Sequence, residues 1–214
     1  MKPIVIAIDG PAASGKGTLA RRLAAAFNLP YLDTGLLYRA VARRVLDHRA
    51  DPADVGAATE EARSLTRIDL DRADLRTPEV DRAASIVASL APVRAALLDF
   101  QRGFAGTTGA VLDGRDIGTI VFPNADVKLF LTASVRERAR RRYAERLAQG
   151  TRTTLEAVQA DLEARDEADR TRDAAPMRPA LDAHVLDTST IDADHAFATA
   201  AAIVNAANKK SVMR

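Results

Sequence analysis

The residues with the clearest chemistry form a glycine-rich loop near the start of the sequence: Gly10, Pro11, Ala12, Ala13, Ser14, Gly15, Lys16, Gly17 and Thr18. Gly10 and Gly15 permit backbone conformations that a side chain would obstruct, and they leave room for phosphate oxygens. The N–H groups of such a loop turn inward and form a nest for an anion. Lys16 adds an ammonium group suited to the β- and γ-phosphates of a nucleotide. The loop is therefore predicted to bind a nucleoside triphosphate.

The segments on either side of this loop have the pattern that a phosphate-binding loop requires. Ile4 to Ile8 is a short apolar run that suits a strand buried on both faces of a parallel sheet. Leu19 to Phe27 is predicted to form a helix, whose positive N-terminal end points at the same anion. Strand, glycine loop and helix together are the context of a P-loop. A simple glycine turn between a core strand and a core helix is the alternative interpretation.

A second group of polar residues follows the next predicted strand, Tyr31–Leu32. Thr34 is predicted to cap a helix that reaches about Arg49, and Tyr38 and Arg39 lie in its first turns. Thr34 and Tyr38 share a face of that helix. These residues suit a second phosphate group, although an ordinary cap beside a half-buried Tyr explains them equally well.

A third group lies at the end of the predicted strand Ala110–Asp113, in the run Asp113-Gly114-Arg115-Asp116. A carboxylate at the carboxyl end of a central strand beside a P-loop commonly positions a magnesium-bound water. We expect Asp113 and Thr18 to contact Mg²⁺ mostly through water. A plain Asp-Gly turn at the end of a strand is the alternative.

The late part of the chain is rich in arginine. Ser134 is predicted to begin a long helix whose arginines mostly face solvent, and Thr153 to Glu156 has the pattern of a capping box for the next helix. In that helix Arg165 and Asp169 share a face, and Arg172 lies three residues beyond Asp169. They form either ordinary helix ion pairs or part of a mobile lid.

The remaining segments complete an alternation of strands and helices. We expect helices at residues 51–66, 78–89, 93–102 and 192–208, strands at 126–131 and 184–186, a loop at 103–109 and a frayed tail at 208–214. Arg67 to Arg76 is too charged for a full strand. Five strands that alternate with helices predict an α/β fold with a parallel sheet.

The composition restricts the possible classes of protein. A chain of 214 residues is expected to form one domain, 1–214, and it has no Cys and only three His, which disfavours disulfides and thiolate or histidine metal sites. Its formal net charge of +2 argues against bulk nucleic-acid binding. We expect no signal peptide, no membrane partner and a cytoplasmic location, because the N-terminal apolar run is too short.

Several motifs together resemble one family. They are Asp9-Gly10-Pro11, Gly15-Lys16-Gly17-Thr18, Asp33-Thr34-Gly35 with Tyr38-Arg39, Ala84-Ser85 with Val87-Ala88, Pro92 with Val93-Arg94, Asp113-Gly114-Arg115-Asp116-Ile117-Gly118-Thr119, Phe122-Pro123, and Arg165-Asp166 with Asp169-Arg170 and Arg172. The chain resembles the bacterial cytidylate kinases, within the nucleoside monophosphate (NMP) kinases. The resemblance implies a three-layer P-loop kinase fold with a five-stranded parallel sheet in the order 2-3-1-4-5 and helices on both faces. It also implies an NMP-binding region at about 39–89 and an Arg-rich lid at about 147–173.

The same resemblance implies roles for individual residues. Ser85, Arg94 and Asp116 would read the cytosine, since a carboxylate accepts from the exocyclic amine and an Arg donates to ring acceptors.

The phosphates and the sugar have their own implied contacts. Arg39 and Arg115 would hold the acceptor phosphate, beside Tyr38 and Thr34. Asp169 with Arg165 would contact the sugar. Lys16, Arg115 and Arg172 would act on the transferring group as catalytic residues.

The sequence departs from the family pattern in two places. The interval from Tyr38 to Ser85 is short for the small sheet that the family usually inserts there, so this insert is predicted to be truncated. Ala168 also stands where the family often has another Arg.

The expected activity is transfer of the γ-phosphoryl group of ATP to CMP or dCMP, with Mg²⁺, by a monomer that binds no nucleic acid. A P-loop kinase for another small acceptor, such as another nucleotide or shikimate, is one alternative. A P-loop switch or nucleic-acid-binding ATPase that uses the basic stretch from Arg138 to Arg152 is another. It is disfavoured because the chain has no Asn-Lys-x-Asp motif and because Gly114, not an acid, follows Asp113.

Overall fold

The computed structural model describes residues 3–212, and their contacts divide the chain into two compact units. The first unit contains the described residues up to Leu32, Ala105–Thr171 and the chain from Ala175 onward. The second contains Asp33–Phe104 and Arg172–Ala174. The expected single domain 1–214, with its NMP-binding and lid regions, stays a prediction.

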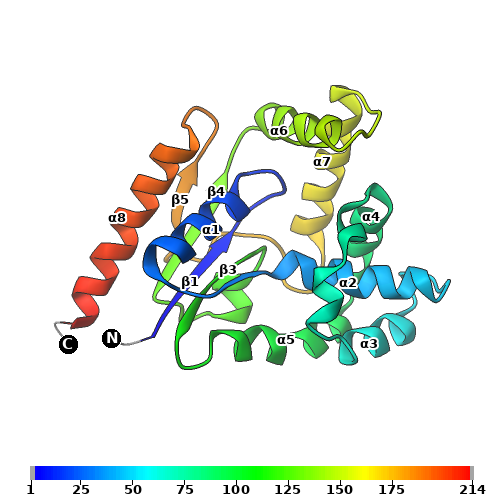
Figure 1. Cartoon of the computed structure of the whole chain (residues 1–214), viewed down its shortest axis with the longest axis horizontal. Coiled ribbons are helices and arrows are strands. Elements are labelled where there is room, and N and C mark those ends of the chain that lie inside the picture. Colours follow the sequence, from blue (N-terminus) through cyan, green and yellow to red (C-terminus); the bar gives the residue numbers. More distant parts are fainter. Residues whose placement is uncertain (1–2, 213–214) are drawn as a thin grey trace. The chain divides into compact units, whose positions relative to one another are not determined.

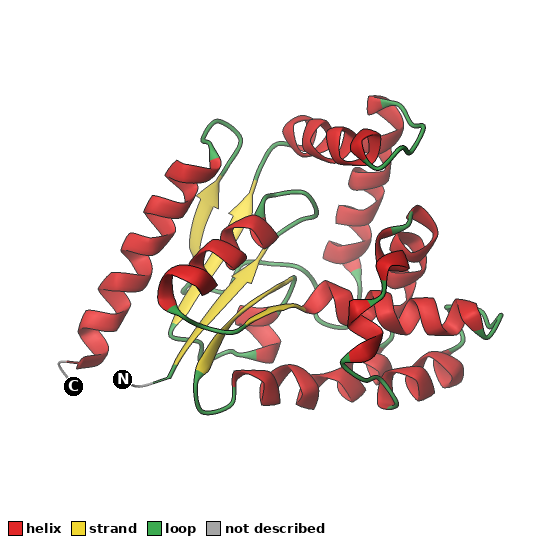
Figure 2. Cartoon of the chain, in the orientation of Figure 1, coloured by secondary structure: helices red, strands yellow, loops and turns green. Residues whose placement is uncertain are grey.

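A parallel sheet forms the centre of the first unit (Figures 1 and 2). Its strands are β1 (Ile4–Asp9), β2 (Tyr31–Asp33), β3 (Gly109–Gly114), β4 (Val127–Thr132) and β5 (His184–Asp187). They lie in the order β2-β3-β1-β4-β5, which confirms the predicted order. The central strand β1 pairs with β3 and β4 along its length, so the residues after these three strands meet at one edge of the sheet.

The helices of the first unit are α1 (Lys16–Phe27), α6 (Val135–Ala148), α7 (Leu155–Thr171) and α8 (Ala193–Val212), with a short π-helical turn, η3 (Ile117–Val121). Helices α1 and α8 share an apolar core with the sheet, to which Leu23, Val204, Ile6 and Leu129 belong among others. Helices α6 and α7 pack against each other and enclose Ala12 of the glycine-rich loop in a smaller apolar cluster.

The second unit is built from helices and 3₁₀ turns joined by short loops. Its elements are α2 (Thr34–Asp47), α3 (Val55–Arg63), the 3₁₀ turns η1 (Ile68–Asp71) and η2 (Ala73–Arg76), α4 (Pro78–Val87) and most of α5 (Ala91–Ala105). The charged run Arg67–Arg76, predicted not to form a strand, forms the two 3₁₀ turns. Thr77 caps α4 by accepting a hydrogen bond from the backbone N–H of Val80.

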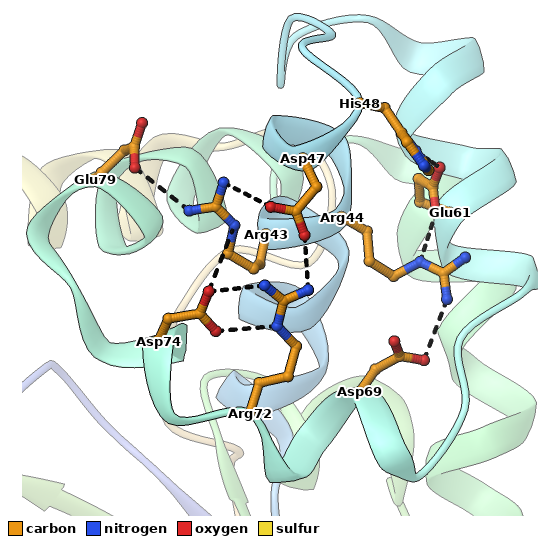
Figure 3. A network of polar contacts seen from close by, with 9 residues as sticks. All are labelled: Arg43, Arg44, Asp47, His48, Glu61, Asp69, Arg72, Asp74 and Glu79. Atoms are coloured by element: carbon orange, nitrogen blue, oxygen red, sulfur yellow. Dashed lines mark hydrogen bonds and ion pairs between the residues drawn. The ribbon is translucent and has the colours of Figure 1, made fainter.

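Ion pairs hold these short elements together (Figure 3). Arg44 on α2 donates to Glu61 on α3 at 2.6 Å and to Asp69 on η1 at 3.1 Å. Arg72 contacts Asp47 and Asp74 at 2.6 and 2.7 Å. The side chains of Arg44, Glu61 and Asp69 are 22%, 13% and 18% exposed, so this part of the network is largely shielded from water. Shielded pairs of this kind fix α3 and η1 to α2.

Two predicted helix caps were wrong. Asp33, not Thr34, is the N-cap of α2, and it makes no side-chain capping hydrogen bond, while Thr34 is the first helical residue and is buried. Helix α7 begins one residue later than the capping box requires. Thr154 accepts from the N–H of Ala157, so Glu156 is not at the capping position.

Several predicted boundaries also differ from the structure. Helix α5 begins at Ala91 and continues to Ala105, so the predicted loop 103–109 is mostly helix and strand. Helix α3 is shorter than the predicted 51–66. Helix α8 continues to Val212, which contradicts a frayed tail from residue 208, and residues 213–214 lie outside the described part.

Within the described residues, no single helix is both long and apolar enough to cross a membrane. Helices α4 and α5 taken together meet the criteria of length and composition alone, with a bend of 98° between them.

The ion-pair network predicts the effect of removing its central cation. We expect Arg44→Met to lower the free energy of unfolding by roughly 1–3 kcal/mol, because it leaves two shielded carboxylates without their guanidinium. Urea unfolding of the wild type and the variant measures this difference. The matched control is Arg63→Met at the exposed end of α3, which should change stability by no more than about 0.5 kcal/mol. Equal effects of the two substitutions would contradict the role of Arg44.

Candidate functional site

The glycine-rich loop between β1 and α1 has the backbone that its sequence predicts (Figure 1). Gly10 has φ +140°, and a Cβ there would lie 1.9 Å from the carbonyl oxygen of Leu131, so only glycine fits against the neighbouring strand. Gly15 and Ala13 also have positive φ, 91° and 58°. Such left-handed residues turn successive N–H groups toward one side of a loop. The Lys16 Nζ donates to the carbonyl oxygen of Pro11 at 2.7 Å, which folds the ammonium over the loop.

The buried Arg138 and the half-buried Arg141 lie behind this loop. Arg138 on α6 donates to the carbonyl oxygen of Ala12 at 3.3 Å and pairs with Asp166 of α7 at 2.6 Å. Thr188 donates through its hydroxyl to the carbonyl oxygen of Ser14 at 3.1 Å, and Arg141 contacts Thr188. The carbonyl oxygens of the loop therefore have donors behind it, which favours N–H groups on the anion side.

The predicted magnesium residues lie in the same unit. Asp113 ends the apolar part of β3, is buried, and accepts a hydrogen bond from the Tyr31 hydroxyl at 2.9 Å. Thr18 is exposed in the first turn of α1. Asp113 Oδ2 lies 3.9 Å from the position of a Cβ at Gly17, so this carboxylate is beside the end of the loop. No cage of three or more metal-ligating side chains occurs in residues 3–212. A hydroxyl and one carboxylate fit Mg²⁺ that is held largely by substrate phosphates.

A second buried carboxylate, for which the sequence predicted no role of its own, connects two loops. Asp9 is the last residue of β1, and its two oxygens accept from the backbone N–H groups of Ile117 and Gly118, each at 2.8 Å. These N–H groups begin η3, directly after Asp116. Burial raises the pKa of the Asp9 carboxyl to about 6. The two N–H groups and Lys16 act to lower this pKa, while the nearby charge of Asp116 raises it further.

Arg115 and Asp169 form the closest ion pair of the Asp113–Asp116 loop. Arg115 Nε contacts Asp169 Oδ2 at 2.7 Å, and the two side chains are 18% and 8% exposed. Burial acts to lower the pKa of the Arg115 guanidinium, but the charges of Asp169, Asp113 and Asp166 outweigh it and raise the pKa. The structure thus brings together two predicted site residues that are far apart in sequence. Arg165 is half-buried on the same helix, α7.

The predicted acceptor residues of the second unit also gather. Tyr38 and Arg39 on α2 are buried, and the Arg94 guanidinium of α5 lies 5.3 Å from the centre of the Tyr38 ring. Arg39 pairs with Asp81 of α4 at 2.7 Å. Ser85 is half-buried, four residues after Asp81 on α4. Base-reading and phosphate-binding candidates thus lie on three packed helices of one unit.

The structure distributes the remaining candidates between the two units. Thr34 is buried at the start of α2, and Arg172 belongs to the short segment that groups with the second unit. Asp116 is buried at the end of β3 in the first unit. The sequence indicated no role for Asp9, Arg138 and Thr188, which each contact main-chain atoms far away in the sequence and so leave no spacing pattern. For Asp9, the signals were an acid directly after an apolar strand and its place in the motif Asp9-Gly10-Pro11.

The sheet order and the loop between β1 and α1 define a P-loop kinase fold. Solved structures with this fold include an uncharacterised protein from Eubacterium ventriosum, with a TM-score of 0.59 and 17% identity over 96% of this chain and 99% of that one. They also include a gluconokinase from Sinorhizobium meliloti, with a TM-score of 0.53 and 14% identity over 99% of this chain and 97% of that one. At these identities the likeness shows the fold alone.

Sequence comparison narrows the class to a family. The cytidylate kinase family model matches residues 6–206, and the chain belongs to this family. Its curated relatives include the cytidylate kinase of Acidiphilium cryptum, 74% identical over 95% of this chain and 96% of that protein. The cytidylate kinase of Granulibacter bethesdensis is 59% identical over 94% of this chain and 96% of that protein.

The raised pKa of Asp9 predicts a specific dependence of stability on pH. The unfolded chain releases the Asp9 proton near pH 3.8 and the folded chain near pH 6, so the folded state binds more protons between these values. The free energy of unfolding should therefore fall as the pH rises from 4 to 7, by roughly 3 kcal/mol from this residue. The measurement is the difference in unfolding free energy between the wild type and Asp9→Asn at each pH. A difference that stays constant with pH contradicts the assignment.

Proposed function

We propose that this protein transfers the γ-phosphoryl group of ATP to CMP or dCMP, giving ADP and CDP or dCDP. The observation that carries the proposal is the match to the cytidylate kinase family across residues 6–206, supported by relatives that bear that name. The match includes both the P-loop and the residues proposed to bind the acceptor. The reaction needs no general base, because a phosphate monoester with a second pKa near ~6 is largely dianionic at neutral pH.

The P-loop and Lys16 bind the donor in this proposal. The Lys16 ammonium donates to the Pro11 carbonyl oxygen in the structure, and it moves to contact the β- and γ-phosphates when ATP binds. Arg138 and Thr188 keep the loop carbonyls turned away from those anions. Because these contacts fix the loop before ATP binds, the loop need not rearrange when charge develops on the transferring phosphoryl group.

The phosphate and the base of the acceptor have separate contacts under this proposal. Arg39 and Arg115 hold its phosphate, with Tyr38 and Thr34 beside them, and Ser85, Arg94 and Asp116 read the base.

The sugar and the transferring group have separate contacts. Asp169 and Arg165 contact the sugar, while Arg172 neutralises the moving phosphoryl group. Asp169 keeps Arg115 charged and oriented before the substrate arrives.

Phosphoryl transfer in this family generally uses a divalent metal, and we propose Mg²⁺ bound with ATP. Thr18 and Asp113 are its proposed protein contacts, mostly through water. Bound there, the ion would neutralise charge on the phosphate oxygens. The monomeric state, the cytoplasmic location and the truncated insert stay predictions, as does the lack of nucleic-acid binding.

Loss of the loop lysine tests the donor half of the site. Lys16→Ala should lower kcat by at least about 100-fold, because the phosphates lose their main side-chain cation. The folded state should persist, since the apolar core between the sheet and helices α1 and α8 is formed by other side chains. A coupled ADP-release assay and a circular dichroism melt measure the two quantities. Turnover close to wild type in a folded variant contradicts the assignment.

An acceptor panel tests the other half. With ATP as donor, CMP and dCMP should be used in preference to UMP and AMP. Arg94→Met should raise the KM for CMP by at least about tenfold while the KM for ATP stays within about twofold, because Arg94 is proposed to contact only the acceptor base. A preference for AMP, UMP or shikimate in the wild type would show another acceptor. Salt-sensitive binding of RNA or DNA at physiological ionic strength would instead favour the nucleic-acid-binding alternative.

A further inference from the structure

The carboxylate of Asp9 is not among the groups proposed to contact ATP or the acceptor nucleotide. It ends the central strand directly before Gly10 of the P-loop, and it is 4% exposed. Both of its oxygens are used, one by the N–H of Ile117 and one by the N–H of Gly118. One buried side chain therefore fixes the start of the turn that follows the base-reading candidate Asp116.

The turn held by Asp9 has an unusual geometry. Ile120 and Val121 both donate to the carbonyl oxygen of Asp116, at 2.9 and 3.2 Å, and Phe122 donates to Ile117 at 2.7 Å. The last bond spans five residues, which makes η3 a π-turn, a feature common at functional sites. The first N–H groups of such a turn have no partner within it, so they need an external acceptor. Asp9 supplies that acceptor.

The space beside this carboxylate is closely filled. A Cβ at Gly118 would lie 3.2 Å from Lys128 Cδ and 3.4 Å from Asp9 Oδ2, so the turn lies close against both side chains. Lys128 is itself fixed by the Pro123 carbonyl oxygen at 2.6 Å and by Asp182 at 2.8 Å. The charged groups that act on Asp9 are Asp116 and Lys16. The turn after Asp116 therefore has little freedom to shift.

We propose that Asp9 is a positioning residue for base selection: its carboxylate fixes the backbone that follows Asp116 and so orients the Asp116 carboxylate toward the exocyclic amine of the acceptor base. This inference rests on the proposed function, in which Asp116 reads cytosine. A carboxylate favours an amino group over a carbonyl oxygen at the same position, so the orientation of Asp116 bears directly on the choice between CMP and UMP. Asp9 itself touches no substrate.

The ionisation of Asp9 supports this role. With a pKa of about 6, the group is mostly a carboxylate at neutral pH, although burial disfavours the charge. Two N–H donors at 2.8 Å and the Lys16 ammonium offset part of the effect of that burial. Charge-assisted hydrogen bonds of this kind are stronger than neutral ones and hold geometry more firmly.

The test is the ratio of kcat/KM for CMP to that for UMP, measured at saturating ATP in the wild type and in Asp9→Asn. An Asn at this position directs an amide NH₂ at one of the two backbone N–H groups, so one hydrogen bond is lost. We expect the ratio to fall roughly 10- to 100-fold, as small displacements of a positioning contact do. The KM for ATP should stay within about threefold. A general loss of folded protein lowers both kcat/KM values together and leaves the ratio unchanged.

Two further variants separate this role from simple damage to the fold. Gly118→Ala adds a methyl group 3.2 Å from Lys128 Cδ and 3.4 Å from Asp9 Oδ2, so the turn must shift slightly to fit it. The ratio should fall in the same direction, by a smaller factor. Asp126→Asn is the matched control, because Asp126 also accepts a backbone N–H of β1, from Val5 at 2.9 Å, at the opposite end of the strand. It should leave the ratio within about twofold of the wild type.

The outcomes are distinguishable. A wild type that does not prefer CMP over UMP overturns the proposed function and this inference with it. A wild type that prefers CMP, together with an unchanged ratio in folded Asp9→Asn and Gly118→Ala, overturns this inference alone. An equal fall in Asp126→Asn also overturns it, since any loss of a strand-end carboxylate would then have the same effect.

Discussion

The structure depends on compensating charge that is buried at the carboxyl edge of the sheet. Asp9, Lys16, Asp113 and Asp116 are each 4–6% exposed there, and Arg138 behind the loop is 3% exposed. An unpaired charge in such surroundings costs several kcal/mol. The chain avoids this cost by placing backbone N–H groups, a tyrosine hydroxyl and guanidinium groups within hydrogen-bond reach. These charged groups are thus held in place by the protein itself, which is what electrostatic catalysis at the proposed site would require.

Both units have an apolar core, since Leu37, Val80 and Leu97 of the second unit are 0–1% exposed, but the second unit also depends on ion pairs. The first relies on a broad apolar core between its sheet and helices α1 and α8, so its stability is expected to depend on packing. In the second unit, Arg44, Arg72 and their carboxylate partners join short helices and 3₁₀ turns. A charged sequence such as Arg67–Arg76 has too few apolar side chains to form a sheet, but its Arg and Asp side chains can form ion pairs.

Much of the fold could be predicted from the sequence because its signals were local. The apolar run Ile4–Ile8 and the loop from Gly10 to Thr18 identified strand, loop and helix, while the sheet order came from the family resemblance and was confirmed. Helix ends were less accurate, because caps such as Thr154 are decided by one hydrogen bond that neighbouring residues can also make. The resemblance also supplied Arg115 and Asp169, and the structure shows them in contact. The roles of Asp9 and Arg138 could not be predicted, since both contact main-chain atoms that are distant in sequence.

The π-turn η3 has a consequence for how this chain can change in length. Its start is anchored by Asp9, and its far end is followed by the Pro123 carbonyl that Lys128 holds. With both ends fixed, removal of one residue would convert the wide turn into an ordinary helical turn and rotate everything attached to it by about 100°. Natural selection should therefore remove insertions and deletions between residues 116 and 123. The exposed connection around Gly150 should instead tolerate changes in length during evolution.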